Sequence, residues 1–317
     1  YQSGSYLKFE ANENYYKGEP SVKNIVFQII ENADTAILAL QNGEVDAYQM
    51  TPQQVKKLDL DASNLTAYSY TEGRVGYLQI NCNRVTDENV RKALLFAMDR
   101  KAMDDAAFES DEYYSIPYTF LPTNSQFYTE DGVEKYEQDV DKAKSMLEEA
   151  GVSGLKLKLG YISSDAVQSA QALLIQEQLK EVGVTVELAG GDGTAIANAM
   201  KDPDNEYDMY LGGYIMGIDP DTFSSLFEND GAYNYMHYSG YDTIDQLFEE
   251  GRSELDESAR KETYAKLQAA VQDTGAFYPI ISNNKILVVN NRIQGVEDAG
   301  LVPVYTFEDT SSLKIAE

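Results

Sequence analysis

The sequence predicts an α/β protein, and the clearest indication lies between residues 155 and 188. Residues 155–161 alternate apolar and polar, as in a strand with one buried face. Residues 163–182 follow with apolar side chains at helical spacing, and residues 184–188 alternate again. A strand, a crossover helix and a second strand at this spacing predict a βαβ unit with parallel strands.

The N-terminal part shows the same alternation of strand and helix. Residues 24–30 are a near-continuous apolar run, which predicts a strand buried on both faces. A helix capped by Asp34 or Thr35 follows, and residues 45–48 predict a short strand. Thr51-Pro52 predicts a further helix, with a threonine cap and proline at its first position.

The middle of the chain continues this pattern and then loses it. Residues 76–81 predict a strand, and Thr86 is expected to cap a helix whose apolar face lies between residues 90 and 98. Residues 108–138 carry prolines and tyrosines with little periodicity, so we expect a long surface excursion. A helix is predicted over residues 141–150.

The helices of the second half are predicted from their apolar stripes and caps. The helix over 163–182 is expected to bury Ala166, Ala170, Leu173, Leu174 and Val182. A helix near 193–200 and a strand over 207–211 follow. Residues 243–246 predict a capping box, Asp256 is expected to begin a longer helix, and residues 286–289 predict a strand.

Composition excludes several classes of function. The 317 residues include 53 acidic and 25 basic side chains, for a net charge of -28, which would repel nucleic acid and anionic lipid. No apolar run approaches the roughly 18 residues of a membrane span, so no membrane insertion is expected. Cys82 and His237 are the only cysteine and histidine, which excludes an intrachain disulfide and cysteine- or histidine-rich metal sites. We therefore predict no catalytic residues, no metal and no cofactor.

One segment combines features of a binding surface. Gly212 and Gly213 end a predicted buried strand, where another backbone could approach closely. Tyr214 adds a broad amphipathic side chain, and Asp219-Pro220 predicts a turn. An extended peptide could add here as an extra strand through main-chain hydrogen bonds. The alternative is a strand that simply ends in a turn.

Several motifs in sequence order resemble one known family. Residues 12–20 (NENYYKGEP) and 39–46 (ALQNGEVD) resemble the "NPDYW-G-P … L-x-x-G-E-V-D" signature of extracytoplasmic solute-binding protein family 5, the oligopeptide- and dipeptide-binding proteins of ABC importers. Residues 77–100 are similar to its "YLxFN … VRxAxxxAIDR" motif. Residues 141–151 and 176–186 resemble two of its helix motifs.

The resemblance implies a type II periplasmic-binding-protein-like fold, with two α/β lobes of mixed sheets flanked by helices that close over a ligand. In that family the first signature lies well inside the polypeptide, so the chain is expected to be a C-terminal fragment with lobe one incomplete. Residues 1–74 would then be a remnant of lobe one and residues 75–284 a complete lobe two. Residues 285–317 would return to lobe one.

The resemblance also implies a ligand site. Gly213 and Tyr214 match the start of the family's "G-W-x-x-D" segment, whose aspartate pairs with a peptide α-amino group in many members. That position falls at Met216–Gly217, where no acid stands. Asn234 matches an asparagine that can bond the ligand main chain. The candidate ligand-binding residues are Gly212, Gly213, Tyr214, Ile215, Met216, Asp219 and Asn234.

The expected function is that of an extracytoplasmic receptor, in the periplasm or as a cell-surface lipoprotein. It would bind a small solute, with an oligopeptide as the first candidate, and deliver it as a monomer to an ABC permease. Nickel chelates, oligosaccharides and opine-like compounds, which relatives of this fold bind, remain open. Two other classes stay open: a hydrolase with two carboxylates in one cleft, and a surface adhesin with a flat aromatic patch.

Overall fold

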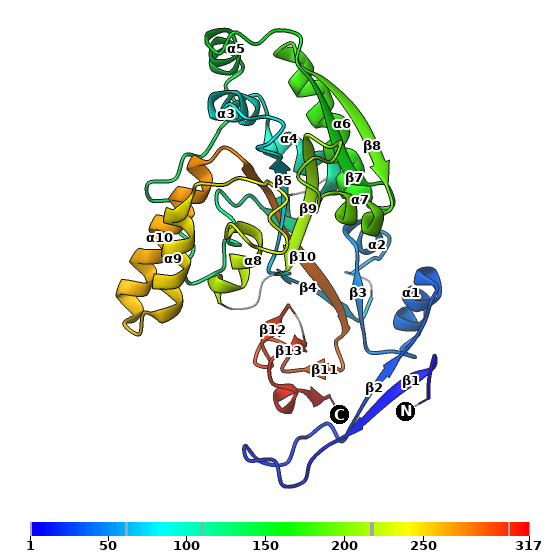
Figure 1. Cartoon of the computed structure of the whole chain (residues 1–317). Coiled ribbons are helices and arrows are strands. Elements are labelled where there is room, and N and C mark those ends of the chain that lie inside the picture. The colour runs from blue at the N-terminus through cyan, green and yellow to red at the C-terminus, as the bar shows by residue number, and fades with distance from the viewer. Residues whose placement is uncertain (1, 61–62, 109–110, 216–218, 304, 317) are drawn as a thin grey trace. The chain divides into compact units, whose positions relative to one another are not determined.

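The chain divides into two compact units in the computed structural model (Figure 1), which describes all residues except 1, 61–62, 109–110, 216–218, 304 and 317. Unit 1 comprises residues 1–72 and 284–317, and unit 2 comprises residues 73–283. No helix in the described part of the chain is long and apolar enough to cross a membrane.

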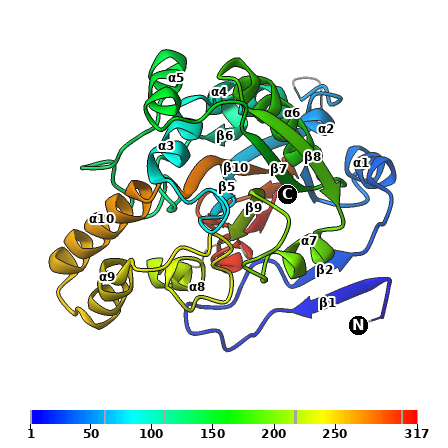
Figure 2. The ribbon, with the colours of Figure 1, turned by 45° about the horizontal axis from the view of Figure 1, so that its top comes forward.

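Unit 2 is built on a mixed sheet in which the strand order is β10-β5-β9-β7-β8. The central strands β5 and β9 are antiparallel, and β7 runs parallel to both β9 and β8. The predicted βαβ unit is confirmed by β7, α6 and β8, which lie side by side in Figures 1 and 2. The strands are β5 (Arg74–Ile80), β6 (Tyr114–Ser115), β7 (Lys156–Ile162), β8 (Thr185–Gly191), β9 (Met209–Ile215) and β10 (Phe277–Asn290).

Most helices of unit 2 begin behind an aspartate that caps the first turn. Asp139, Asp165, Asp192 and Asp256 each accept a hydrogen bond from a backbone N–H two or three residues further on. Part of the acidic excess thus stabilises helix ends. The helices are α3 (Glu88–Phe96), α4 (Arg100–Phe108), α5 (Val140–Glu149), α6 (Ala166–Glu181), α7 (Gly193–Ala199), α8 (Ser224–Phe227), α9 (Asp242–Ser253) and α10 (Glu257–Asp273), with the 3-10 helices η1 (Asp111–Tyr113) and η2 (Pro220–Phe223).

Two large apolar clusters of unit 2 lie on either side of β5, and a smaller one comprises Ile196, Met200, Tyr210 and Tyr235. The first packs α3, α4, α5 and α6 against β7 and β8 and includes Leu78 and Ile80 of β5. The second packs α8, α9 and α10 against Val75 and Tyr77 of the same strand. Because side chains alternate along a strand, β5 contributes to both cores at once.

Unit 1 contains smaller sheets. β1 (Tyr6–Glu10) and β2 (Asn24–Gln28) pair antiparallel, and β3 (Ala47–Met50) and β4 (Leu65–Thr71) pair with residues 284–290 of β10. Thr51 caps α2 through a capping box with Gln54, which confirms the Thr51-Pro52 prediction. The remaining elements are α1 (Ala33–Gln41), α2 (Pro52–Val55), β11 (Ile293–Gln294), β12 (Leu301–Val302), β13 (Thr306–Phe307), η3 (Thr310–Ser312) and β14 (Lys314–Ile315).

The segment 108–138 is irregular, as expected, but parts of it are buried and do not form a surface excursion. Phe120, Leu121, Phe127 and Tyr136 are all buried. The cause is the buried Gln268 of α10, whose amide accepts from the Thr119 hydroxyl and donates to the Phe127 carbonyl, each at 2.9 Å. Hydrogen bonds from a distant helix thus hold this segment in the core, although its sequence shows no periodic apolar pattern.

Four local predictions are also wrong. Asn32, rather than Asp34 or Thr35, caps α1. The strand expected to be buried on both faces is β2, where Val26 and Phe27 are more than half exposed, because a two-stranded ribbon has no layers to cover it. The expected capping box at 243–246 does not form, since α9 begins behind Tyr241 without a side-chain cap. Asp87, rather than Thr86, caps α3.

Helix α6 buries a different stripe from the expected one. Leu173 is 60% exposed, whereas Gln168, Gln171 and Gln178 are buried. Each of these glutamine amides makes a hydrogen bond inside the unit, such as that from the Asp99 N–H to Gln178 Oε1 at 3.0 Å. Hydropathy ranks glutamine as a surface residue, so the periodicity was assigned to the wrong face.

Asp104 of α4 is a buried carboxyl in this packing. Its Oδ1 accepts a hydrogen bond of 3.4 Å from Gln171 Nε2, whereas Oδ2 has no partner among the described residues. Burial raises the pKa of Asp104 to about 8, although the Gln171 hydrogen bond and the charge of Arg100 oppose the shift. The carboxyl is therefore predominantly protonated at neutral pH.

We predict that Asp104→Asn stabilises the protein near neutral pH. The unfolded chain releases the proton at a pH of about 3.9, so the native protein loses stability as pH rises from about 4 toward 8. Asparagine resembles the protonated acid in shape but does not titrate, so it removes this dependence of stability on pH. The expected gain at pH 7 is on the order of a few kcal/mol, since one pKa unit is worth about 1.4 kcal/mol. Urea unfolding between pH 4 and pH 8 measures it.

Asp105→Asn serves as the control because it should have the opposite sign. Hydrogen bonds from Lys101 and Tyr114 lower the pKa of Asp105, so its charged form stabilises the native state above about pH 4. An Asp104→Asn variant whose stability falls with pH as steeply as that of the unchanged protein would contradict the assignment.

Candidate ligand-binding site

The predicted binding segment forms the end of β9, and this end has an open edge. β5 pairs with β9 over its whole length, from Ile80↔Met209 to Arg74↔Ile215. In the part of the chain that the structure describes, the register with β7 stops at Gly160↔Tyr210, so residues 211–215 pair on one side only. Leu211 and Gly212 are buried, whereas Gly213 and Tyr214 are partly exposed and Ile215 is exposed, so the main chain at residues 213–215 is available to a further strand.

The two glycines of β9 make room for neighbouring side chains. A Cβ on Gly212 would lie 2.7 Å from a ring carbon of Tyr77 and 3.0 Å from one of Tyr210. On the opposite face, a Cβ on Gly213 would lie 2.1 Å from Nη2 of Arg74. Tyr77 and Arg74 thus cover the two faces of β9 at the glycines, where another backbone was expected to approach. A further strand can therefore reach β9 only at its open edge.

Tyr214 belongs to an aromatic group beside this edge. Its ring lies 5.4 Å from that of Phe223 and 6.3 Å from that of Tyr233, and its hydroxyl is 3.3 Å from Ser225 Oγ. These contacts fix the orientation of the Tyr214 ring and leave the side chain partly exposed. Ile215 is 54% exposed at the strand end, and Met216 lies outside the described residues.

Asp219 anchors the return of the chain from the site. Its carboxylate accepts a hydrogen bond from the Asp221 N–H at 3.0 Å and from Arg260 Nη2 at 2.6 and 2.9 Å. Partial burial raises the pKa of Asp219, but the hydrogen bonds from Arg260 and Asp221 outweigh it, so the pKa lies below its usual value. Since its carboxylate already accepts hydrogen bonds from Arg260 of α10 and from the backbone of η2, Asp219 has a structural role.

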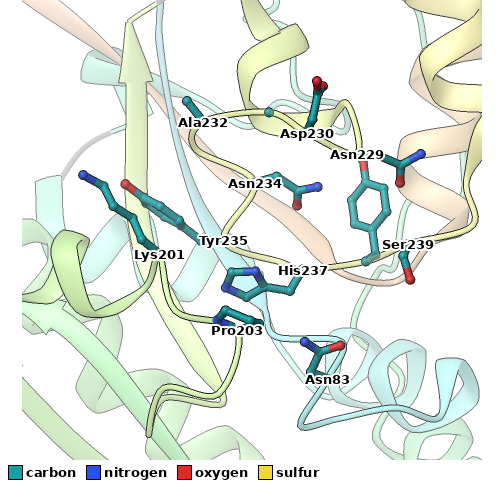
Figure 3. A pocket seen from close by; sticks show the side chains of 12 residues that line it. Asn83, Lys201, Pro203, Asn229, Asp230, Ala232, Asn234, Tyr235, His237 and Ser239 are labelled. Carbon is teal, nitrogen blue, oxygen red and sulfur yellow. The ribbon is translucent and has the colours of Figure 1, made fainter.

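Asn234 lies between Tyr233 and Tyr235, whose rings contact those of Tyr214 and Tyr210 in β9. It lines a polar hollow of about 390 Å³ formed by residues 229–239 with Asn83, Lys201 and Pro203 (Figure 3), and none of residues 212–215 lines it. Its amide donates to the Glu228 carbonyl at 3.1 Å, whereas Oδ1 is buried without a partner among the described residues. The Asn234 amide thus bonds within its own segment, while its neighbours Tyr233 and Tyr235 contact β9.

His237 and Cys82 have structural surroundings. Nε2 of His237 lies 2.8 Å from the Met200 carbonyl, and because a carbonyl only accepts, this nitrogen carries the proton. Burial raises the pKa of the Cys82 thiol to about 11, which keeps it protonated and unreactive. Among the residues with assigned positions, no cluster of three or more His, Cys, Asp or Glu side chains could hold a metal ion.

Arg74 and Tyr77 are site residues that the sequence analysis missed. Both belong to β5, and only the pairing of β5 with β9 brings them to the two glycines. No local motif marks this pairing, because the two strands lie far apart in the sequence. The one informative signal is the pair of adjacent glycines, which indicates bulky neighbouring side chains as readily as an approaching backbone.

The solved structures that resemble this chain define its class. A crystal structure of the ABC transporter substrate-binding protein CtaP from Listeria monocytogenes matches with a TM-score of 0.93 and 37% identity, covering 100% of this chain and 65% of that one. A putative peptide-binding protein AppA from Clostridium difficile matches with a TM-score of 0.91 and 32% identity, covering 99% and 66%. The fold is therefore the type II periplasmic-binding-protein-like fold, as predicted.

The family follows from the sequence. Residues 1–235 match the family described as bacterial extracellular solute-binding proteins, family 5 Middle, and the chain belongs to this family. The oligopeptide-binding protein AppA of Bacillus subtilis is 26% identical over 316 residues, which cover 92% of this chain and 56% of AppA. The chain thus spans just over half the length of this relative. The predicted family membership is confirmed.

Replacing each of the two glycines by alanine should change the free energy of unfolding by different amounts. We predict that Gly212→Ala lowers the free energy of unfolding by roughly 1–3 kcal/mol, because the buried Tyr77 ring cannot move away without strain. Gly213→Ala meets only the mobile end of Arg74 and should cost less than about 1 kcal/mol while displacing the guanidinium. Urea unfolding of both variants tests this order, and equal losses would contradict it.

Proposed function

We propose that this chain carries the ligand-binding lobe of an extracytoplasmic receptor that passes an oligopeptide to an ABC import permease. The observation that carries the proposal is the open edge of β9, which pairs on one side only over residues 211–215 and is exposed at residues 213–215. A peptide added there would form main-chain hydrogen bonds irrespective of its sequence, and Tyr214 would pack against it.

Unit 2 is proposed as lobe two and unit 1 as part of lobe one. Unit 2 supports this assignment because it has its own sheet and two apolar clusters. Closure of two such lobes requires a ligand that binds the closed state better than the open state. The receptor is proposed to act as a monomer, in the periplasm or as a lipoprotein at the cell surface.

The relatives support a peptide over other solutes. The Bacillus subtilis relative is named an oligopeptide-binding protein, and an Escherichia coli relative is named a dipeptide-binding protein. Another Escherichia coli relative is a nickel-binding periplasmic protein, so the fold alone leaves the ligand open. The strand edge favours the peptide, because an extended backbone is the chemistry that complements it.

The hydrolase alternative has little support from the arrangement of acids. A glycosidase-type mechanism needs two carboxyl groups facing one substrate. Asp230 is the one acid among the residues lining the Asn234 hollow, and Asp104, with its raised pKa, is buried between α4 and α6. Asp219 is held by Arg260.

The direct test is native mass spectrometry of the purified protein, followed by denaturation and identification of released molecules. A co-purified peptide would support the proposal. If the protein carries no ligand, calorimetry with random tetrapeptide mixtures follows. The absence of binding to any peptide would overturn it.

Tyr214→Ala should weaken peptide binding while leaving the fold intact. The ring offers its exposed side to the strand edge, and losing an aromatic contact should cost on the order of 1 kcal/mol or more of binding free energy. Tyr241→Ala is the matched control, because Tyr241 is a half-buried tyrosine of the same apolar cluster that contacts the Tyr238 ring, away from β9. Unchanged affinity in Tyr214→Ala by calorimetry would remove Tyr214 from the site.

A further inference from the structure

We propose that Arg74 binds a carboxylate of the ligand at the open edge of β9, so that the receptor selects peptides by an acidic group. The inference rests on the proposed peptide-binding function and adds a specificity-determining residue to it. Three observations carry it: the lack of a partner for Arg74 among the described residues, its position over Gly213, and the absence of charge in the strand end itself.

Arg74 differs from the other arginines of the chain. Across the residues that the structure describes, no hydrogen bond or ion pair holds its guanidinium, although acids outnumber bases by 53 to 25. The six other arginines all donate to carboxylates or backbone carbonyls, and these are Arg84, Arg91, Arg100, Arg252, Arg260 and Arg292. An arginine left unpaired among so many acids is available to a ligand.

The position of Arg74 depends on the missing side chain of Gly213. Arg74 stands opposite Ile215 in the register, and its guanidinium reaches across to β9, where a Cβ on Gly213 would lie 2.1 Å from Nη2 and 2.4 Å from Cζ. A Cβ on Gly76, the partner of Gly213, would lie 3.7 Å from Nη1. The group therefore lies against the strand that carries the open edge. Residues of an added strand would run about 4.8 Å from β9, within reach of this guanidinium.

The chemistry of the site suits a carboxylate. Guanidinium presents a planar fork of donors that matches a carboxylate in a bidentate pair. Residues 211–218 contain no acid and no base, so β9 itself offers no charge that would compete with Arg74 for a carboxylate. Partial burial of Arg74 would strengthen the pair relative to one in open water.

The carboxylate could come from the peptide C-terminus or from a glutamate or aspartate side chain. Four synthetic tetrapeptide libraries distinguish these sources: C-terminal acids and C-terminal amides, each with and without glutamate and aspartate. The purified protein is incubated with each library, and retained peptides are identified by native mass spectrometry. Calorimetry then measures the affinity of an enriched peptide and of its carboxamide analogue.

The variants separate the charge from its placement. Arg74→Gln removes the cation, and Gly213→Ala keeps it but displaces it from β9. Arg84→Gln is the matched control, since Arg84 is an arginine of the same unit that pairs with Asp208 at 2.7 Å. Thermal unfolding confirms that each variant is folded.

We expect carboxylate-bearing peptides to bind about 10- to 100-fold more tightly than their carboxamide analogues, the range of a charge-assisted hydrogen bond. This preference should disappear in Arg74→Gln, shrink in Gly213→Ala and persist in Arg84→Gln. If affinity depends on the C-terminal acid, the bound carboxylate is the peptide terminus; if it depends on glutamate or aspartate, the bound carboxylate is a side chain. Either result supports the proposal.

Two results would overturn the inference, and they are distinguishable. Equal binding of carboxylate and carboxamide peptides, or an unchanged preference in Arg74→Gln, removes Arg74 from the site while peptide binding stands. Failure of the unchanged protein to bind any of the four libraries removes the proposed function and the inference with it.

Discussion

The pairing of β5 with β9 is the contact on which the rest of unit 2 depends. Seven residue pairs join the two strands, from Arg74↔Ile215 to Ile80↔Met209. Leu78 faces the first apolar cluster and Tyr77 faces the second, so one strand forms the wall between two cores. The same pairing carries Arg74 and Tyr77 onto the glycines of β9. Fold and site are thus consequences of a single register.

Much of unit 2 could be predicted from local patterns, because period-2 and period-3.6 alternation reports burial directly. β7, α6 and β8 were predicted in this way, and α10 begins behind Asp256, as expected from the sequence. The method fails where polar side chains are buried. Gln268 forms hydrogen bonds to the segment 108–138 inside the core, and the buried Gln171 lies on the face of α6 that was predicted to be exposed. Such burial depends on partners far away in the sequence.

The candidate site could be predicted only in part. The glycine pair and Tyr214 were identified from local composition, and the structure places them together at an open edge. Asn234 was grouped with them by resemblance, but it lines a separate polar hollow. Arg74 could not be found in this way, because its role depends on a pairing between strands that are distant in the sequence, whereas local patterns extend over a few turns or strands.

The charge distribution explains how a sequence-tolerant site could still be selective. Main-chain hydrogen bonds along a strand edge accept almost any peptide. The net charge of -28 creates a field that opposes anionic peptides at long range, but this field is screened beyond roughly 8 Å at physiological salt. In the proposed site, Arg74 would act inside that distance, on a strand end whose own residues carry no charge. A carboxylate at this position would therefore be recognised locally, and its place would fix the direction and register of a peptide that the backbone alone could bind in several ways.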